Sequence, residues 1–174
     1  MIPRTLFLSS AVALVVATTA TSQITPFPER SPIANFGIGT PGSDGFVPTL
    51  STLGLPRIGN LEFGIRATRV AGGALGAILI STAPTDEMIP GIGNWYLSQP
   101  TVGILPMSAD GDPGVGGAGS AAHQVPLPYR PSFVGTKLYW QGFFIDPDPE
   151  SGRSLSHSNG LVTTLTVPSA ANFL

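Results

Sequence analysis

Glycine and proline interrupt this chain so often that they exclude helices over most of its length. The 174 residues include 22 Gly and 18 Pro. After residue 22, no window of a dozen residues has apolar positions at the 3.6-residue helical spacing without a Gly or Pro inside it. Gly disfavours a helix interior through backbone entropy, and Pro does so through its missing N–H and its ring. The fold is therefore expected to be built from strands.

Short strand-like segments separated by turn residues occupy the same part of the chain. In residues 61–68, four apolar side chains from Leu61 to Ala67 alternate with polar or small ones, which predicts one buried face. The other candidate strands are 46–52, 75–80, 103–107, 118–125, 137–145 and 161–167. Seven or eight such strands predict an all-β fold, an antiparallel β-sandwich of jelly-roll-like or immunoglobulin-like type.

The N-terminus has the pattern of a secretory signal peptide. Arg4 is followed by the apolar run Leu6–Ala17 and then by the small residues Ala20-Thr21-Ser22. The run is shorter than the ~20 residues that span a bilayer. We therefore expect cleavage before Gln23, a mature chain without an integral membrane segment, and a secreted, periplasmic or cell-envelope location.

The rest of the chain is long enough for one domain that needs no disulfide bond, and it contains no Cys. The predicted organisation is a signal peptide at 1–22, a Pro-rich extended lead-in at 23–35, a β-sandwich domain at 36–168 and a C-terminal tail at 169–174.

The chain carries few charges, and they are scattered. Charged residues make up 10% of the sequence, against about 25% in ordinary soluble domains. Nucleic-acid binding needs a clustered basic face, which is absent from the sequence. Weak mutual repulsion favours association, and one lysine, Lys137, is available to protect sheet edges. The predicted partners are further copies of this chain or proteins of an envelope or matrix.

The stretch DPDPESGRSLSHSNG at 146–160 holds the best candidates for a metal site. Asp146, Asp148 and Glu150 stand at alternate positions, and carboxylates at such spacing can converge on calcium. However, the intervening prolines hold the segment extended, and an EF-hand register fails at Ser151 and His157. We interpret the stretch as a connection between two strands, closed by a turn at Asn159-Gly160, and expect no obligatory metal or other cofactor.

Motifs for catalysis or nucleotide binding are weak. Two G-x-G-x-x-G stretches, at 37–42 and 114–119, lack the helix that a dinucleotide site requires. The two histidines, His123 and His157, are expected to be exposed or locally bonded, His123 on a strand and His157 in a turn. No nucleophile motif accompanies them, so we predict that the protein is not an enzyme.

Two aromatic residues are candidates for ligand binding. Trp95 and Tyr96 lie in the long connection 81–101, where an exposed aromatic pair could form a platform for a glycan. The alternative is that Trp95 closes one end of the sandwich, with its N–H donating to a carbonyl.

Four stretches together resemble a known kind of domain: GIGTPGSDGFVPTLSTLGLPRIGN at 37–60, ILIS at 78–81, VPLPYRPSFVGTKLYWQGFFIDP at 125–147 and LSHSNGLVTTLTV at 155–167. They are similar to a small secreted bacterial β-sandwich domain of unknown function, found free-standing behind a signal peptide or at the C-termini of larger exported proteins. Relatives often carry Cys near the positions of Thr40 and Leu55, which this chain lacks. The resemblance implies a fold and a location, and no activity.

These patterns together predict a secreted, non-catalytic structural or interaction module of the cell envelope or extracellular space. The alternative is a carbohydrate- or calcium-dependent binding module.

Overall fold

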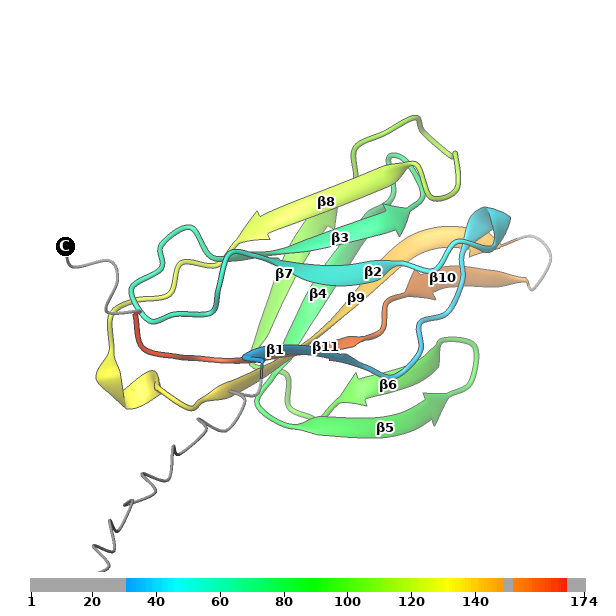
Figure 1. Ribbon diagram of the computed structural model, residues 1–174. Helices are drawn as coiled ribbons and strands as arrows, with labels where there is room; N and C mark the ends of the chain where they lie inside the picture. The colour runs from blue at the N-terminus through cyan, green and yellow to red at the C-terminus, as the bar shows by residue number, and fades with distance from the viewer. Residues whose placement is uncertain (1–30, 149–151, 169–174) are drawn as a thin grey trace, which may run out of the picture. The chain divides into compact units, whose positions relative to one another are not determined.

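The computed structural model describes residues 31–148 and 152–168. The expected signal peptide, the cleavage site before Gln23, Glu150 and the predicted tail lie outside these ranges. The described part is all-β, with eleven strands in antiparallel sheets and two single turns of 3₁₀ helix, η1 (Ser43–Gly45) and η2 (Pro131–Phe133) (Figure 1). Within it, no helix has the length and apolar character that crossing a membrane requires.

Two packed sheets form a sandwich, and a hairpin forms a separate two-stranded sheet (Figure 1). The six-stranded sheet has the order β1 (Ile33–Phe36), β11 (Gly160–Thr164), β9 (Lys137–Asp148), β4 (Leu75–Ser81) and β7 (Gly103–Ser108), with β10 (Arg153–His157) also paired to β9. The three-stranded sheet is β2 (Thr49–Leu53), β3 (Gly64–Val70) and β8 (Gly119–Gln124). The hairpin is β5 (Pro84–Ile89) and β6 (Gly93–Leu97). The predicted all-β antiparallel sandwich is confirmed, with more strands than expected.

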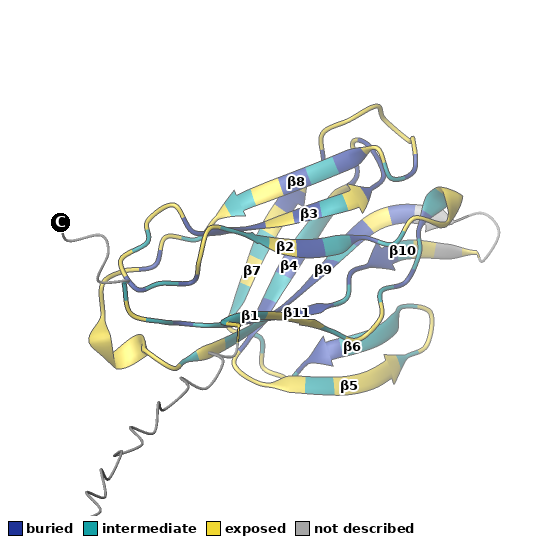
Figure 2. Cartoon of the chain, viewed as in Figure 1, coloured by how far each residue is buried: buried dark blue, intermediate teal, exposed yellow. Residues whose placement is uncertain are grey.

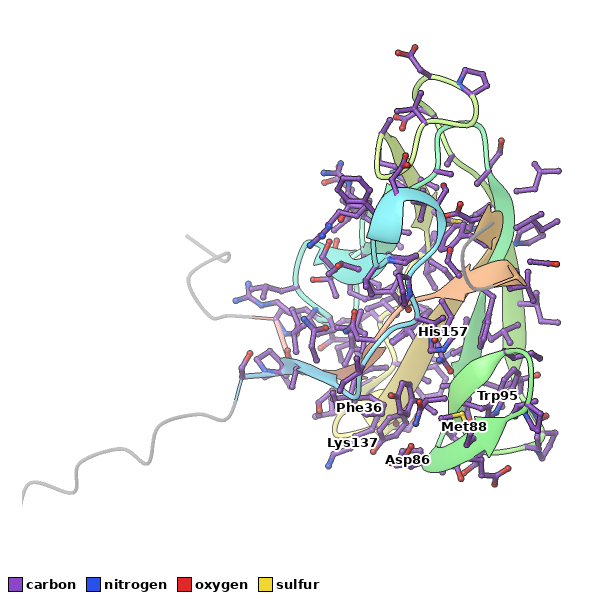
Figure 3. The ribbon with its side chains drawn as sticks, turned by 90° about the vertical axis from the view of Figure 1, so that its right-hand side faces the viewer. Phe36, Asp86, Met88, Trp95, Lys137 and His157 are labelled. Atoms are coloured by element: carbon purple, nitrogen blue, oxygen red, sulfur yellow. The ribbon has the colours of Figure 1, made fainter. Side chains whose placement is uncertain are left out.

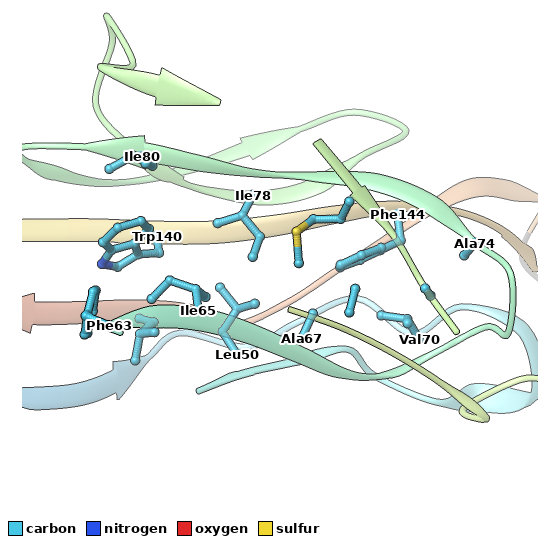
Figure 4. Close-up of a cluster of buried hydrophobic side chains, with 14 of the residues drawn as sticks. Leu50, Phe63, Ile65, Ala67, Val70, Ala74, Ile78, Ile80, Trp140 and Phe144 are labelled. Carbon is cyan, nitrogen blue, oxygen red and sulfur yellow. The ribbon is translucent and has the colours of Figure 1, made fainter. Parts of the chain in front are cut away.

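The core lies between the facing sides of the two sheets (Figure 4). Trp140, Ile78 and Phe144 come from the six-stranded sheet and pack against Ile65 and other apolar residues of the three-stranded sheet. The buried indole N–H of Trp140 donates to the Thr163 hydroxyl at 3.0 Å. The polar N–H of this large buried aromatic residue therefore has a hydrogen-bond partner.

The alternation in residues 61–68 is confirmed for the inward positions of β3. Phe63, Ile65 and Ala67 are fully buried, as predicted. Leu61 is 65% exposed, which contradicts its predicted inward position. The reason is that β3 begins only at Gly64, so Leu61 belongs to the loop that precedes the strand.

Four strands were not predicted from the sequence. β1 includes residues 33–35 of the expected lead-in, and β5 and β6 lie in the expected 81–101 connection. β10 pairs with β9 inside the predicted 146–160 connection, and β9 itself continues to Asp148. That prediction is therefore wrong in its bounds. The turn between β10 and β11 contains Ser158 and Asn159 only.

β7 is an edge strand that is protected by a proline. Ala109 N donates to Ala74 O at 2.9 Å, so residues 74 and 109 form a hydrogen-bonded pair directly before β4 and directly after β7. Hydrogen-bonded pairs alternate along an antiparallel ladder, and the amides of residues 103, 105 and 107 therefore also point toward β4. Residues 104, 106 and 108 therefore face the free edge. Pro106 occupies the middle one of these three positions and has no N–H to offer another strand.

Replacing Pro106 by valine should increase self-association, because the substitution adds a donor in the middle of the free edge. Light scattering coupled to size-exclusion chromatography should show a larger oligomer fraction than for the unsubstituted protein. Pro128→Val, an exposed proline outside any strand, is the matched control. Equal oligomer fractions for both variants would contradict this role of Pro106.

Candidate functional site

The side chain of Gln141 joins the hairpin β5–β6 to the six-stranded sheet by hydrogen bonds. Gln141 points away from the core, opposite to Trp140, and is completely buried beneath β6. Its Oε1 accepts from Tyr96 N at 2.9 Å and its Nε2 donates to Asn94 O at 2.8 Å. These are the two bonds that a neighbouring strand would make. The other edge of β6 pairs with β5, so the hairpin stands on its edge above the sheet.

Aromatic contacts hold the hairpin on both sides of this attachment. The ring of Trp95 stacks on Phe143, with centroids 5.2 Å apart, and its N–H donates to Leu97 O. On the other side, Tyr96 meets the edge of Phe36, with centroids 5.6 Å apart. Its hydroxyl donates to Ile38 O at 2.9 Å and accepts from Ile38 N at 2.7 Å. Phe36 lies on β1 and Trp95 on β6 (Figure 3).

This arrangement separates the two residues of the predicted glycan platform. Trp95 and Tyr96 are consecutive in a strand and so point to opposite sides of it. Tyr96 is buried, whereas Trp95 is half-buried. A sugar could therefore reach only Trp95 of the pair. The indole N–H reaches a carbonyl, as in the structural alternative, but Trp95 lies against the outer side of a sheet rather than at an end of the sandwich.

A buried Thr40–His157 pair lies next to Gln141. The two backbones exchange hydrogen bonds, Thr40 N to His157 O at 2.9 Å and His157 N to Thr40 O at 3.3 Å. His157 Nδ1 lies 3.0 Å from Ser158 O, which can only accept. Gln141 Nε2, a donor, also lies 3.3 Å from Nδ1. The contact with Ser158 O is the shorter of the two and favours hydrogen on Nδ1, so that Nε2 accepts from the Thr40 hydroxyl at 2.6 Å. His157 is fully buried on β10, which corrects its expected position in a turn.

A hydroxyl bonded to an imidazole is the arrangement that activates a nucleophile in many enzymes. Here the pair is closed by the hairpin. A Cβ added to Gly93 would overlap both His157 Nε2 and Thr40 Oγ1, so the site has no room even for a methyl group. The pair joins the loop 37–42 to β10.

Asp146, on the core side of β9, joins this strand to the turn at Ser43 by hydrogen bonds. Its Oδ1 accepts from the backbone N of Ser43 at 3.0 Å and from the Ser43 hydroxyl at 2.6 Å. Its Oδ2 lies 3.4 Å from the Ser156 hydroxyl. A Cβ added to Gly42 would overlap this carboxylate, so Asp146 fits tightly against the turn that contains η1.

The other two predicted calcium ligands lie beyond what the structure describes of side chains. Asp148 is the last residue of β9, and Glu150 lies outside the described ranges. Among the residues that are described, no three His, Cys, Asp or Glu side chains form a group that could hold a metal ion.

The outer side of the six-stranded sheet next to the hairpin carries what we call the apolar face. It consists of the apolar residues Leu75, Ala77, Leu79, Ile104, Pro106, Phe143, Ile145 and Leu155, and the exposed Ser108 borders it beside Leu75. The strand register places them side by side on β4, β7, β9 and β10. Leu75, Ile104 and Ile145 are 59%, 61% and 58% exposed, and exposed residues on this sheet are visible in Figure 2.

The outer side of the three-stranded sheet is different in character. Its residues are Thr49, Ser51, Leu53, Arg66, Thr68, Ser120, Ala122 and Gln124. Most of these are polar, and Arg66 occupies the central strand. One outer side of the sandwich is therefore suited to water, and the other exposes apolar side chains.

Comparison with family models, with curated proteins and with solved structures finds no match for this chain. The structure shows a small all-β protein of antiparallel sheets, and the comparisons identify no family for it.

Gln141→Met should destabilise the protein, because Tyr96 N and Asn94 O would both lose their partner. An unsatisfied buried group costs about 1–3 kcal/mol, so we expect the free energy of unfolding to fall by about 2 kcal/mol. Urea denaturation measures the loss, and hydrogen exchange of the Tyr96 amide locates it. Gln124→Met, on the exposed outer side of β8, is the control. Unchanged exchange at Tyr96 would show that Gln141 does not hold the hairpin.

Asp146→Asn should lower the melting temperature equally in calcium and in a chelator. The carboxylate is bonded to Ser43, and the amide replaces one acceptor by a donor, at a cost of about 1–3 kcal/mol. Asp112→Asn, at an exposed position, is the control. A calcium-dependent stabilisation of the unsubstituted protein that is lost in Asp146→Asn would contradict this interpretation, because a ligand bound to the folded state raises its stability.

Proposed function

We propose that this protein is a secreted, non-catalytic interaction module, and that it binds a partner through the apolar face. The observation that carries this proposal is the contrast between the two outer sides of the sandwich. Exposed apolar surface is unfavourable by about 25 cal/mol per Å², and contiguous patches of it mark interaction sites.

The apolar face is supported by rigid structure. β4 and β9 are paired on both of their edges, and the Trp95–Phe143 stack fixes the side next to the hairpin. A rigid surface loses little conformational entropy when it binds. The closed Thr40–His157 pair supports a function through contact rather than through catalysis.

Export to the cell envelope or extracellular space is part of the proposal. It rests on the signal-peptide pattern in residues 1–22 and on the resemblance to a secreted bacterial sandwich domain. The partner would be a protein of that compartment or another copy of this chain.

The size of the apolar face suggests a weak contact. Strands lie ~4.8 Å apart and same-face residues ~6.8 Å apart along a strand, so eight positions cover roughly 260 Å². A standard stable interface takes about 800 Å² from each partner. The apolar face alone therefore supports association that depends on concentration.

Leu75→Lys should reduce association, because it places a charge at the most exposed β4 position of the apolar face. Analytical ultracentrifugation over a hundredfold concentration range should show oligomers of the unsubstituted protein and fewer of the variant, with little dependence on salt. Leu61→Lys makes the same change at a similarly exposed leucine, 65% against 59%, outside the apolar face. A strictly monomeric unsubstituted protein, or an equal effect of Leu61→Lys, would contradict self-association through this face.

A further inference from the structure

Residues of three segments line an open pocket of about 670 Å³. In Figure 1 the loop between β2 and β3, which supplies most of the lining, runs at the end of the sandwich where η2 lies. The pocket walls come from the loop 54–60, from Tyr129 and from Pro168. Small-molecule sites typically have volumes of about 300–1,000 Å³, so the pocket has the size of a ligand site.

Backbone hydrogen bonds hold the pocket walls together. Ile58 N donates to Thr166 O at 2.9 Å, and Gly59 N donates to Leu127 O at 2.9 Å. The side chain of Asn60 donates to Leu55 O at 2.9 Å within the same loop. Because these bonds join three separate segments, the pocket exists before any ligand binds.

The pocket has one charged residue among the described residues that line it, Arg57. Arg57 is half-buried, and its guanidinium has no hydrogen-bond or ion-pair partner among the described residues. Guanidinium groups bind carboxylates through two parallel hydrogen bonds. A half-buried arginine without a partner is therefore a recognition element for an anion.

Most of the other lining residues are apolar or aromatic, and Asn60 is the polar exception among those described. The exposed ring of Tyr129 packs on Gly59, where an added Cβ would lie 3.4 Å from the ring. Leu55 is partly exposed on the pocket wall. A single cation among apolar walls matches a ligand with a single negative charge, whereas a phosphate dianion would need further donors.

We infer that this pocket binds a carboxylate carried on an apolar or aromatic group. Arg57 pairs with the carboxylate, and Tyr129 and Leu55 contact the apolar body. A free organic acid and the C-terminal carboxylate of a peptide that ends in an apolar residue share this chemistry. The site is independent of the proposed function, because none of its residues belongs to the apolar face.

Isothermal titration of the full chain with 3-phenylpropionate tests the inference, with 3-phenylpropionamide as the uncharged probe. We expect saturable binding of the acid and at least tenfold weaker binding of the amide. A tripeptide Gly-Phe-Leu, acetylated at its N-terminus, with a free or an amidated C-terminus, distinguishes the two sources of the carboxylate. Whichever free acid binds more tightly identifies the source.

Arg57→Gln should weaken binding of the acid at least tenfold and leave the melting temperature unchanged. Arg130→Gln is the matched control, because it removes an equal charge at the same end of the molecule, where Arg130 lies 5.7 Å from the Phe133 ring. Tyr129→Leu should weaken 3-phenylpropionate more than hexanoate, which has no ring. The inference is overturned if neither acid binds saturably, if the amides bind as tightly as the acids, or if Arg130→Gln has the same effect as Arg57→Gln.

Discussion

The arrangement of the molecule outside its core depends on one buried amide, that of Gln141. Because this amide bonds to the edge of β6, the hairpin stands upright over β9 instead of lying flat across the sheet. The upright position places Trp95 against Phe143 and leaves β4 and β7 uncovered. A buried amide is favourable only when its partners are present. The same two hydrogen bonds therefore determine which part of the sheet is hidden and which part is available to a partner.

The loop 37–42 shows why its glycines occur where they do. Added Cβ atoms would meet the Tyr96 ring at Gly37, the His157 carbonyl at Gly39 and the Asp146 carboxylate at Gly42. The G-x-G-x-x-G spacing of this loop thus permits close backbone contact with three buried groups. It is followed by η1, a single turn of 3₁₀ helix, and not by the helix of a nucleotide site.

The strands that could be predicted from the sequence are those whose apolar side chains are buried between the two sheets of the sandwich. Residues 137–145 are an example, because alternate side chains of β9 pack on two different layers. The hairpin strands and β10 escaped prediction because they are held by distant groups rather than by their own apolar pattern. His157 contacts Thr40, 117 residues away, and no local rule links them. The one signal in the sequence was Gln141, a single amide within the apolar and aromatic stretch 137–145, because a buried amide requires hydrogen-bond partners.

The attachment through Gln141 also affects how this fold can diversify. A strand inside a sheet has its length and register fixed by the hydrogen bonds to both neighbouring strands. The hairpin is instead hydrogen-bonded to the sheet at Asn94 and Tyr96, through the side chain of Gln141. At its tip between β5 and β6, a Cβ added to Gly91 would have no other atom within 4 Å. Insertions there would lengthen the wall beside the exposed strands without shifting any residue of the two sheets. The hairpin is thus the part of this architecture that evolution can reshape independently of the body that carries it.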